Sequence, residues 1–203
     1  MNIISFFSGC GGLDLGFHQS GYKILYAMDN SSDCKESHET NFKNTIFELE
    51  SIQNLSSKII RDKIGNKEIS LVIGGSPCPP FSKSRFYRKE KPQAFKDILG
   101  WETVSNFFRL IGEIQPEGFV FENVAGFAYK KNISSLDYVL NLSKKYGYEC
   151  THKVINTANY GIPQIRERFI LVGLKSNKFI FPEETHTKNN NLDLFDHHKK
   201  PWV

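Results

Sequence analysis

The chain has 203 residues, of which 39% are hydrophobic and 13% aromatic, so it is long enough for one substantial domain with a packed core. Its formal net charge of +4 is mildly basic, which is compatible with a nucleic-acid partner without establishing one. Its four cysteines form no C-x-x-C pair, which argues against a zinc site or a disulfide framework, and no apolar run is long enough to span a membrane.

The first residues, Met1–Phe7, contain no basic side chain and run directly into glycines. They therefore predict a first strand and not a signal peptide. Scattered cysteines without a pairing pattern also fit a reducing compartment. We expect a cytoplasmic protein, associated with the nucleoid if the host is a bacterium, with no membrane contact and no bound metal.

Short apolar runs alternate with longer amphipathic stretches along the chain. Strands are predicted at residues 2–7, 23–28, 70–74, 118–122, 149–156 and 169–173, and helices at residues 13–20, 31–41, 52–64, 101–114 and 135–146. The fourth helix shows the helical period well, because Val104, Phe107, Phe108, Ile111 and Ile114 share one face. This alternation predicts an α/β fold with a doubly wound, mostly parallel sheet and helices on both faces.

Two segments fit neither kind of element. Residues 83–96 carry basic side chains interleaved with aromatic ones, and they predict a long loop of the kind that covers or binds a ligand. After Pro182 the composition becomes polar. We therefore expect one domain over residues 1–182, followed by a polar tail or linker over residues 183–203.

A glycine-rich loop, Ser8-Gly-Cys-Gly-Gly12, separates the first predicted strand from the first predicted helix. Glycines there allow a tight turn and a close approach of a ligand to the main chain, near the free N–H groups of the helix. Asp29 ends the second predicted strand, where an acidic side chain in such folds holds a ribose hydroxyl. The spacing is not G-x-G-x-x-G, and no P-loop pattern is present, so a dinucleotide is not favoured. A tight turn followed by a solvated aspartate is the alternative.

Cys78 lies in the segment Pro77-Cys-Pro-Pro-Phe-Ser82, directly after an apolar run. Two prolines follow it, so neither a strand nor a helix continues there, and this position favours a nucleophile over a core residue. The other three cysteines, Cys10, Cys34 and Cys150, are expected to be small buried side chains.

Glu122 ends the strand predicted at residues 118–122, in an apolar setting that is expected to raise its pKa and to suit proton donation. Arg166 and Arg168, two residues apart, would project to the same side before the last strand. The alternatives are a carboxylate held in a salt bridge and a surface charge pair around Glu167. If these strand ends converge on Cys78, the chain has a site for attacking a pyrimidine ring.

The order of these motifs resembles the cytosine-C5 DNA methyltransferases. The four matching motifs are Phe7–Leu13, Pro77-Cys78, Glu122-Asn-Val124 and Gln164-x-Arg-x-Arg168, and the segment Asn159-Tyr-Gly-Ile-Pro163 before the glutamine also matches. The resemblance covers residues 2–175, and four motifs in one order are far more specific than any one of them. It implies a Rossmann-like domain that uses S-adenosylmethionine and acts on double-stranded DNA, within a restriction-modification system.

The resemblance also implies roles for individual residues. With the target cytosine flipped out of the duplex, Cys78 would attack C6, Glu122 would protonate or hydrogen-bond N3, Arg168 would hold O2 and Arg166 would help to order the thiolate. Cofactor contacts are implied for Phe7, Ser8, Gly9, Gly12, Asp29, Asn30 and Pro77, with Asp29 on the ribose and Asn30 by the adenine. DNA contacts are implied for Ser82, Lys83, Arg85, Arg88 and Lys89.

The chain departs from the family pattern at three places. Pro79 replaces the usual glutamine after the nucleophile, and Ser51 stands where an aspartate often contacts the adenine. The target-recognition region and the last two motifs of the family are absent. We therefore expect a truncated product, a fragment, or one chain of a split enzyme that a second polypeptide completes. An RNA cytosine-C5 methyltransferase and a non-catalytic nucleic-acid-binding module are the competing interpretations.

Overall fold

The computed structural model describes residues 1–82, 94–188 and 199–203. Its main sheet has seven strands in the order β3-β2-β1-β4-β5-β7-β6. Every neighbouring pair is parallel except the two pairs that contain β7, which runs antiparallel to both β5 and β6. The strands are β1 (Asn2–Phe6), β2 (Lys23–Asp29), β3 (Ile46–Leu49), β4 (Leu71–Gly75), β5 (Gly118–Val124), β6 (Glu149–Asn156) and β7 (Glu167–Leu174).

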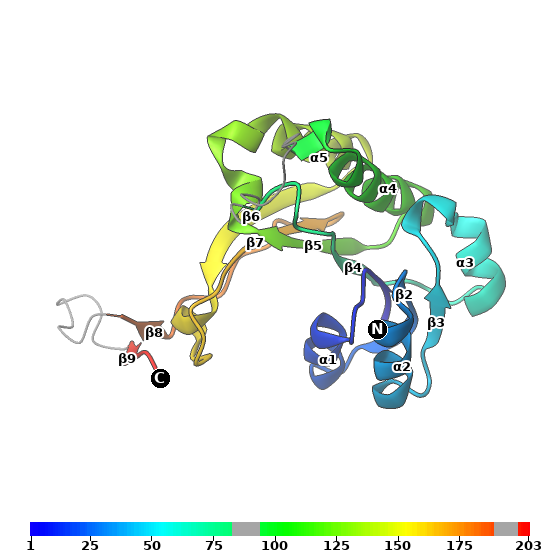
Figure 1. Ribbon diagram of the computed structural model, residues 1–203, viewed down its shortest axis with the longest axis horizontal. Coiled ribbons are helices and arrows are strands. Elements are labelled where there is room, and N and C mark those ends of the chain that lie inside the picture. The colour runs from blue at the N-terminus through cyan, green and yellow to red at the C-terminus, as the bar shows by residue number, and fades with distance from the viewer. Residues whose placement is uncertain (83–93, 189–198) are drawn as a thin grey trace.

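Helices cover the sheet from both sides, as the sequence predicts. The helices are α1 (Gly12–Gln19), α2 (Ser32–Asn41), α3 (Ser57–Ile64), α4 (Ile98–Ile114) and α5 (Ile133–Lys145). In Figure 1, α4 and α5 lie above the sheet, whereas α1 and α2 lie below it. This arrangement confirms the doubly wound α/β fold.

The longest helix, α4, packs aromatic side chains against the sheet. It begins where the Asp97 carboxylate accepts a hydrogen bond from the Leu99 N–H at 3.1 Å, and it ends at Gln115, which is left-handed with φ 54°. The predicted apolar face is buried, and the Phe107 ring meets the Phe6 ring of β1 edge-on, with centroids 6.0 Å apart. Each such buried aromatic side chain contributes about 1.5–3 kcal/mol.

The helix predicted over residues 52–64 is wrong in its first turn. Residues Ile52–Asn54 form a 3₁₀ turn, and Leu55 turns into the core instead of continuing a helix. Helix α3 starts at Ser57 because the Ser56 hydroxyl accepts a hydrogen bond from the Ile59 N–H and caps it. Strand β3 was not predicted, because it has four residues and buries only Phe47 among them.

The chain reverses its direction of travel across the sheet between β1 and β4. From β1 it moves outward through β2 to β3, and then it returns to β4 on the other side of β1 before moving on to β5. In open α/β sheets this reversal leaves a crevice at the carboxyl ends of the strands, where ligands bind. The residues that follow β1, β2, β3, β4 and β5 therefore decide what the protein can bind.

The β6–β7 pair extends beyond the rest of the sheet toward two short strands, β8 (His186–Thr187) and β9 (Lys200–Pro201) (Figure 1). Asn159 joins this end to the last residues, because its carbonyl accepts from the Thr185 N–H at 2.9 Å and its side-chain oxygen accepts from the Trp202 indole at 3.0 Å. The division of the chain at residue 182 stays a prediction. None of the helices in the described residues is long and apolar enough to cross a membrane.

Candidate active site

A cavity of about 200 Å³ lies at the reversal point of the sheet. It contains four of the predicted cofactor residues, which are Phe7, Asp29, Asn30 and Pro77. Its remaining lining residues are Met28, Glu50, Ser51, Ile52, Gln53, Gly75, Leu99, Glu102 and Thr103. The strand ends predicted to form a ligand site therefore do meet around one hollow.

The loop that follows β1 has an unusual backbone at the edge of this cavity. Phe7 is left-handed with φ 54°, a conformation that few residues other than glycine adopt, and its N–H faces the Met28 sulfur at 3.4 Å. Gly11 has φ 90°, and a Cβ atom there would lie 2.4 Å from the Phe42 ring. The left-handed backbone of Phe7 costs about 1–3 kcal/mol and persists where surrounding contacts enforce it, whereas Gly11 adopts its φ without strain. The loop is therefore held tightly against α2.

The Asp29 carboxylate fastens the loop to the start of α2. One oxygen accepts a hydrogen bond from the Gly9 N–H at 2.9 Å, and the other accepts from the Ser31 N–H at 3.2 Å. Each carboxylate oxygen has a second lone pair, so both can still accept from a ligand hydroxyl. Asp29 thus combines a structural role with the ability to hold a ribose.

A buried polar network supports the loop from beneath. The Asp14 carboxylate pairs with His38 at 2.7 Å and accepts from the Ser5 hydroxyl, and both Asp14 and His38 are fully buried. The Ser8 hydroxyl lies 3.0 Å from the Ser5 hydroxyl, so this side chain points into the network. Ser8, Gly9 and Gly12 are not among the cavity-lining residues, and their cofactor role remains a prediction that rests on the backbone.

Several cavity residues escaped the sequence analysis. Glu50 follows β3, and its pKa is lowered by hydrogen bonds from the Ser51 N–H and the Asn54 amide. Glu50 directly follows β3, so it could have been identified as a site residue only if β3 had been predicted. The first turns of α4 contribute Leu99, Glu102 and Thr103 to the cavity. The helical period predicts which face of a helix is buried, but it does not predict that the first turns of the helix line a cavity.

The segment with Cys78 is a compact turn after β4. The Cys78 carbonyl accepts hydrogen bonds from the N–H groups of Phe81 and Ser82, both at 3.0 Å. Phe81 is buried against Phe127, with ring centroids 4.6 Å apart. Gly126 allows this packing, because a Cβ atom there would lie 2.2 Å from the Phe81 carbonyl oxygen. The turn is anchored at Phe81, and Cys78 itself is exposed.

Glu122 and Arg168 form an ion pair at the same edge of the sheet. The Glu122 Oε1 atom lies 2.7 Å from the Arg168 Nε atom, and their side chains are only 28% and 21% exposed. Gly75 on β4 is paired with Glu122 and leaves space for its carboxylate, because a Cβ atom at Gly75 would lie 2.7 Å from Glu122 Oε2. Burial raises the pKa of Glu122, and the positive charges of Arg168 and Arg166 oppose this rise without cancelling it. The sequence analysis treated a raised pKa and a salt bridge as alternatives for Glu122, and the structure has both.

A hydrogen bond ties the start of the Cys78 turn to the end of β5. The buried Asn123 side chain, next to Glu122, donates to the Ser76 hydroxyl at 2.9 Å. Ser76 directly precedes Pro77 and Cys78 in the chain. Arg168 pairs with Glu122 from the first residues of β7, and Arg166 directly precedes this strand and is exposed. The structure thus brings the four predicted catalytic residues to one edge.

The remaining site predictions have mixed outcomes. Lys83, Arg85, Arg88 and Lys89 lie outside the described residues, and Ser82 is present at the end of the Cys78 turn. The prediction that the other three cysteines are buried is wrong for Cys10, which is exposed between two left-handed glycines, and Cys34 and Cys150 are only partly buried. Within the described ranges, no group of three or more His, Cys, Asp or Glu side chains could hold a metal ion.

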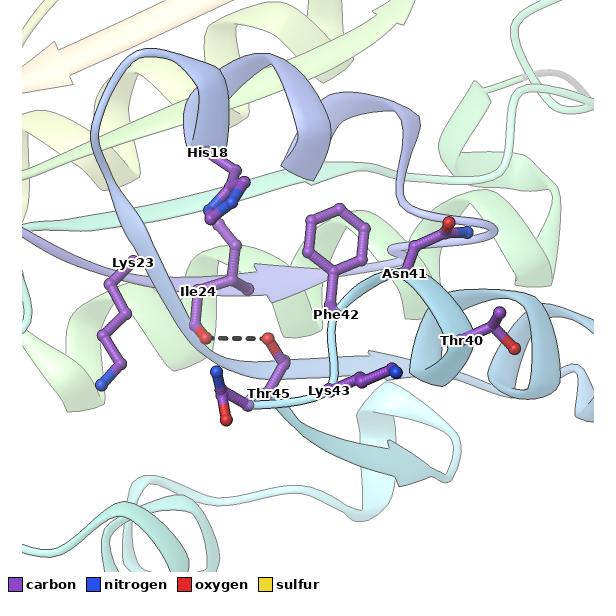
Figure 2. Close-up of a pocket in the computed structure, with 9 residues that line it drawn as sticks. His18, Lys23, Ile24, Thr40, Asn41, Phe42, Lys43 and Thr45 are labelled. Atoms are coloured by element: carbon purple, nitrogen blue, oxygen red, sulfur yellow. Dashed lines mark hydrogen bonds between the residues drawn. The ribbon is translucent and has the colours of Figure 1, made fainter.

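A larger hollow of about 420 Å³ lies at the opposite end of the strands (Figure 2). Its residues surround the start of β2 and the turn before β3, where the Thr45 hydroxyl donates to the Ile24 carbonyl at 2.9 Å. The side chains of His18, Lys23 and Phe42 line it. It contains none of the predicted site residues, so we assign the ligand site to the smaller cavity, which contains four of them.

Comparisons with known proteins agree with this geometry. The family model of the C-5 cytosine-specific DNA methylases matches residues 1–201. The chain is 34% identical to the Type II methyltransferase M.AquIA of Picosynechococcus, over 98% of this chain and 84% of that protein. It is 33% identical to the Type II methyltransferase M.SacI of Streptomyces achromogenes, over 99% of this chain and 55% of that protein.

Solved structures with the same fold give a similar result. A prophage-encoded E. coli protein described as a DNA modification methyltransferase superposes with a TM-score of 0.72 and 29% identity, over 86% of this chain and 47% of that chain. The Entamoeba histolytica methyltransferase EhMeth superposes with a TM-score of 0.72 at 21% identity, over 91% and 56%. Apart from M.AquIA, the chain therefore spans about half the length of these proteins.

Proposed function

The chain belongs to the C-5 cytosine-specific DNA methylase family, and on this premise we propose that it methylates cytosine at C5 in double-stranded DNA. The observation that carries the proposal is the half-buried Glu122–Arg168 pair, because Glu122 is paired with Gly75 at the end of β4, where the Cys78 turn begins. A partly buried acid and an accessible thiol at one strand edge are the two groups that attack on a pyrimidine requires.

The cavity at the reversal point fits S-adenosylmethionine. Asp29 offers carboxylate lone pairs for the ribose, Phe7 and Pro77 add apolar surface to the cavity wall, and Ser8, Gly9 and Gly12 would line the methionine part. Asn30 and Ser51 would lie by the adenine. When bound, this cofactor supplies an electrophilic methyl group. The residues of the chain would hold it with C5 of the base between the cavity and Cys78.

Each catalytic residue then has a defined task. The target base leaves the duplex, because its ring atoms are not accessible in the stack. The Cys78 thiolate forms a bond to C6 while Glu122 gives a proton or a hydrogen bond to N3, which lets the electron pair move to C5. Once C5 carries the methyl group it loses its proton to a water molecule and the C6–S bond breaks. Any proton on N3 returns to Glu122, and 5-methylcytosine and the thiolate are released. Arg168 would hold both Glu122 and the base O2.

Recognition of a particular DNA sequence is a separate part of the proposal. We propose that a second polypeptide carries the target-recognition region and that the enzyme serves a restriction-modification system. The support comes from the lengths of two relatives. The aligned segments are 214 and 217 residues long, but they cover 84% of M.AquIA and only 55% of M.SacI, so M.AquIA is the shorter protein. A short member of the family therefore exists among the relatives.

The proposed function is tested with methyl-labelled S-adenosylmethionine and unmethylated duplex DNA. After digestion to nucleosides, the label should appear in 5-methyl-2′-deoxycytidine, alone or after addition of a candidate second polypeptide. A parallel reaction on RNA of the same sequence should remain unlabelled. Label in the RNA arm alone would favour the RNA methyltransferase. The absence of label in every arm, or its presence on N4, would contradict the proposal.

A further inference from the structure

One carboxylate in the wall of the cofactor cavity has no task in the proposed reaction. Glu102 lies in the second turn of α4, is partly buried and lines the cavity. Its backbone carbonyl accepts from the Asn106 side chain at 2.8 Å, but within the described ranges its carboxylate has neither a hydrogen bond nor an ion pair. A partly buried carboxylate that the chain does not satisfy is available to accept hydrogen bonds from a ligand.

Glu102 is the first member of a polar stripe along α4. Asn106, Arg109 and Glu113 follow it at intervals of three or four residues, so the four side chains lie on one face of the helix. The Asn106 side-chain oxygen accepts from Arg109 Nε at 2.8 Å, and Arg109 forms an ion pair with Glu113. The later members of the stripe are therefore bonded to one another.

The stripe is fastened to the chain that follows β3. Arg109 donates to the Leu55 carbonyl at 2.8 Å, and the Glu113 carboxylate accepts from the Ser57 N–H at 2.8 Å. The stripe thus faces the 3₁₀ turn after β3 and the start of α3. Because this turn also borders the cavity, Glu102 at the beginning of the stripe lies at the end of the cavity beside β3.

The end of the cavity beside β3 is where the base of the proposed cofactor would lie. The glycine loop follows β1, Asp29 ends β2 and Glu50 follows β3, and these strands are neighbours in the order β3-β2-β1. With the ribose on Asp29 and the methionine part over the glycine loop, the adenine extends toward β3 and Glu102. This step rests on the proposed function, because it takes the cavity to be the cofactor site.

We propose that the Glu102 carboxylate accepts a hydrogen bond from the 6-amino group of adenine and so determines which purine the cofactor site takes. The amino group is a donor and the carboxylate is only an acceptor, so a purine without this group would leave the carboxylate unpaired. Glu50, a second carboxylate at this end, is oriented by its own turn. One of its oxygens accepts from the Ser51 N–H at 2.8 Å and from the Asn54 amide at 2.9 Å.

The test compares two ligands by calorimetry on the full chain. S-Adenosylhomocysteine carries the 6-amino group, and its 6-deamino analogue carries hydrogen in that place. The two ligands have the same charges, so a general attraction to a carboxylate cancels in the ratio of their Kd values. The wild-type protein should bind S-adenosylhomocysteine about tenfold to hundredfold more tightly, as expected for one hydrogen bond to a charged group.

Glu102→Leu should bring this ratio to within about threefold of one, because the coupling between the side chain and the amino group is lost. It should leave the affinity for the 6-deamino analogue unchanged or improved, since no carboxylate is then left unpaired. A substitution that merely damaged the cavity would weaken the binding of both ligands. Glu102→Gln should give an intermediate ratio, because its amide oxygen still accepts a hydrogen bond.

Glu117→Leu, at an exposed position, is the matched control and should keep the wild-type ratio. A wild-type ratio near one, or an equal loss of affinity for both ligands in Glu102→Leu, would overturn the proposal. So would a ratio that collapses in Glu50→Leu and not in Glu102→Leu. A wild-type protein that binds neither ligand would contradict the proposed function as well, whereas binding with an unaltered ratio in Glu102→Leu would contradict this inference alone.

Discussion

The cofactor half and the catalytic half of the sheet edge are built in different ways. In the cofactor half, the Asp29 carboxylate ties the glycine loop to α2 through two backbone N–H groups, and a fully buried Asp14–His38 pair lies beneath it. In the catalytic half, the acid is fixed by one ion pair on the sheet, whereas Cys78 stands exposed on a turn anchored at Phe81.

This difference indicates how the two steps of the proposed reaction are divided. A binding site gains affinity from groups that are already in place, because less conformational entropy is lost when the ligand arrives. A nucleophile has to reach a base that enters from outside, so exposure is an advantage for it. We therefore expect substitutions in one half to change cofactor binding and substitutions in the other to change turnover.

The largest expected effect is that of Cys78→Ser. Methyl transfer should fall by about a thousandfold or more, because a serine hydroxyl is a far weaker nucleophile than a thiolate. The Kd for S-adenosylmethionine should not change, since Cys78 is not among the residues that line the cavity. Calorimetry and a methyl-transfer assay separate the two quantities. A parallel loss of affinity would break the distinction between the halves.

Glu122→Gln should lower turnover by about a hundredfold or more, because the amide donates no proton to N3. Burial raises the pKa of Glu122, so the protonated form persists to a higher pH than for an ordinary glutamate and is lost as the pH rises through the raised pKa. The wild-type rate should fall over that range, and the variant's rate should not. Glu117→Gln, at an exposed position, is the matched control and should leave the profile unaltered.

Asp29→Asn addresses the cofactor half. Loss of a charged acceptor at this position costs about 1.5–3 kcal/mol, which corresponds to roughly a tenfold to hundredfold rise in the KM for S-adenosylmethionine. The kcat at saturating cofactor should change little. The control is Asp33→Asn on the exposed side of α2. An unchanged KM together with a reduced kcat would contradict the assignment of Asp29 to cofactor binding.

Gly126→Ala should disturb the anchor of the catalytic turn. The added methyl group would lie 2.2 Å from the Phe81 carbonyl oxygen, so the turn has to shift, at a cost of about 1–3 kcal/mol in stability. Turnover should fall more than cofactor affinity. Gly16→Ala is the control, because a Cβ atom there meets nothing within 4 Å and the residue lies inside α1, so it should be neutral or stabilising. Equal losses of stability in the two variants, measured by urea denaturation, would contradict the role of Gly126.

The smallest effect is expected from Tyr148→Phe, which lies in neither half. The buried Tyr148 hydroxyl donates to the Pro116 carbonyl at 2.7 Å, so its removal should lower the free energy of unfolding by about 1 kcal/mol. Cofactor affinity and turnover measured below the unfolding transition should stay at wild-type values. A change in cofactor affinity or in turnover would mean that this hydrogen bond in the core also affects the site.

The sequence predicted those parts of the site that lie at the ends of strongly apolar strands. Asp29 and Glu122 could be located because each ends or nearly ends such a run, and parallel strands bring their carboxyl ends to one edge. The raised pKa of Glu122 was likewise readable from its apolar neighbours. The α4 face was found because its period is long and regular.

The missing parts depend on tertiary contacts that a pattern does not contain. Strand β3 is an edge strand of four residues whose pairing with β2 decides its conformation, and Glu50 was missed with it. The 3₁₀ turn at Ile52 exists because that side chain enters the core. The link from Gly9 to Ser31 requires the Asp29 carboxylate to bridge two segments, and residues 22 positions apart show no sign of this in the sequence.

The central claim is that Cys78 attacks C6 of a cytosine beside Glu122. The most direct test is to incubate the protein with S-adenosylmethionine and a duplex that contains 5-fluorocytosine, which blocks release because C5 has no proton to lose. A candidate second polypeptide is included in a parallel reaction. We predict a covalent protein–DNA adduct that peptide mass spectrometry maps to Cys78 and that Cys150→Ser leaves intact. An adduct on another residue, or no adduct in either reaction, would contradict the account.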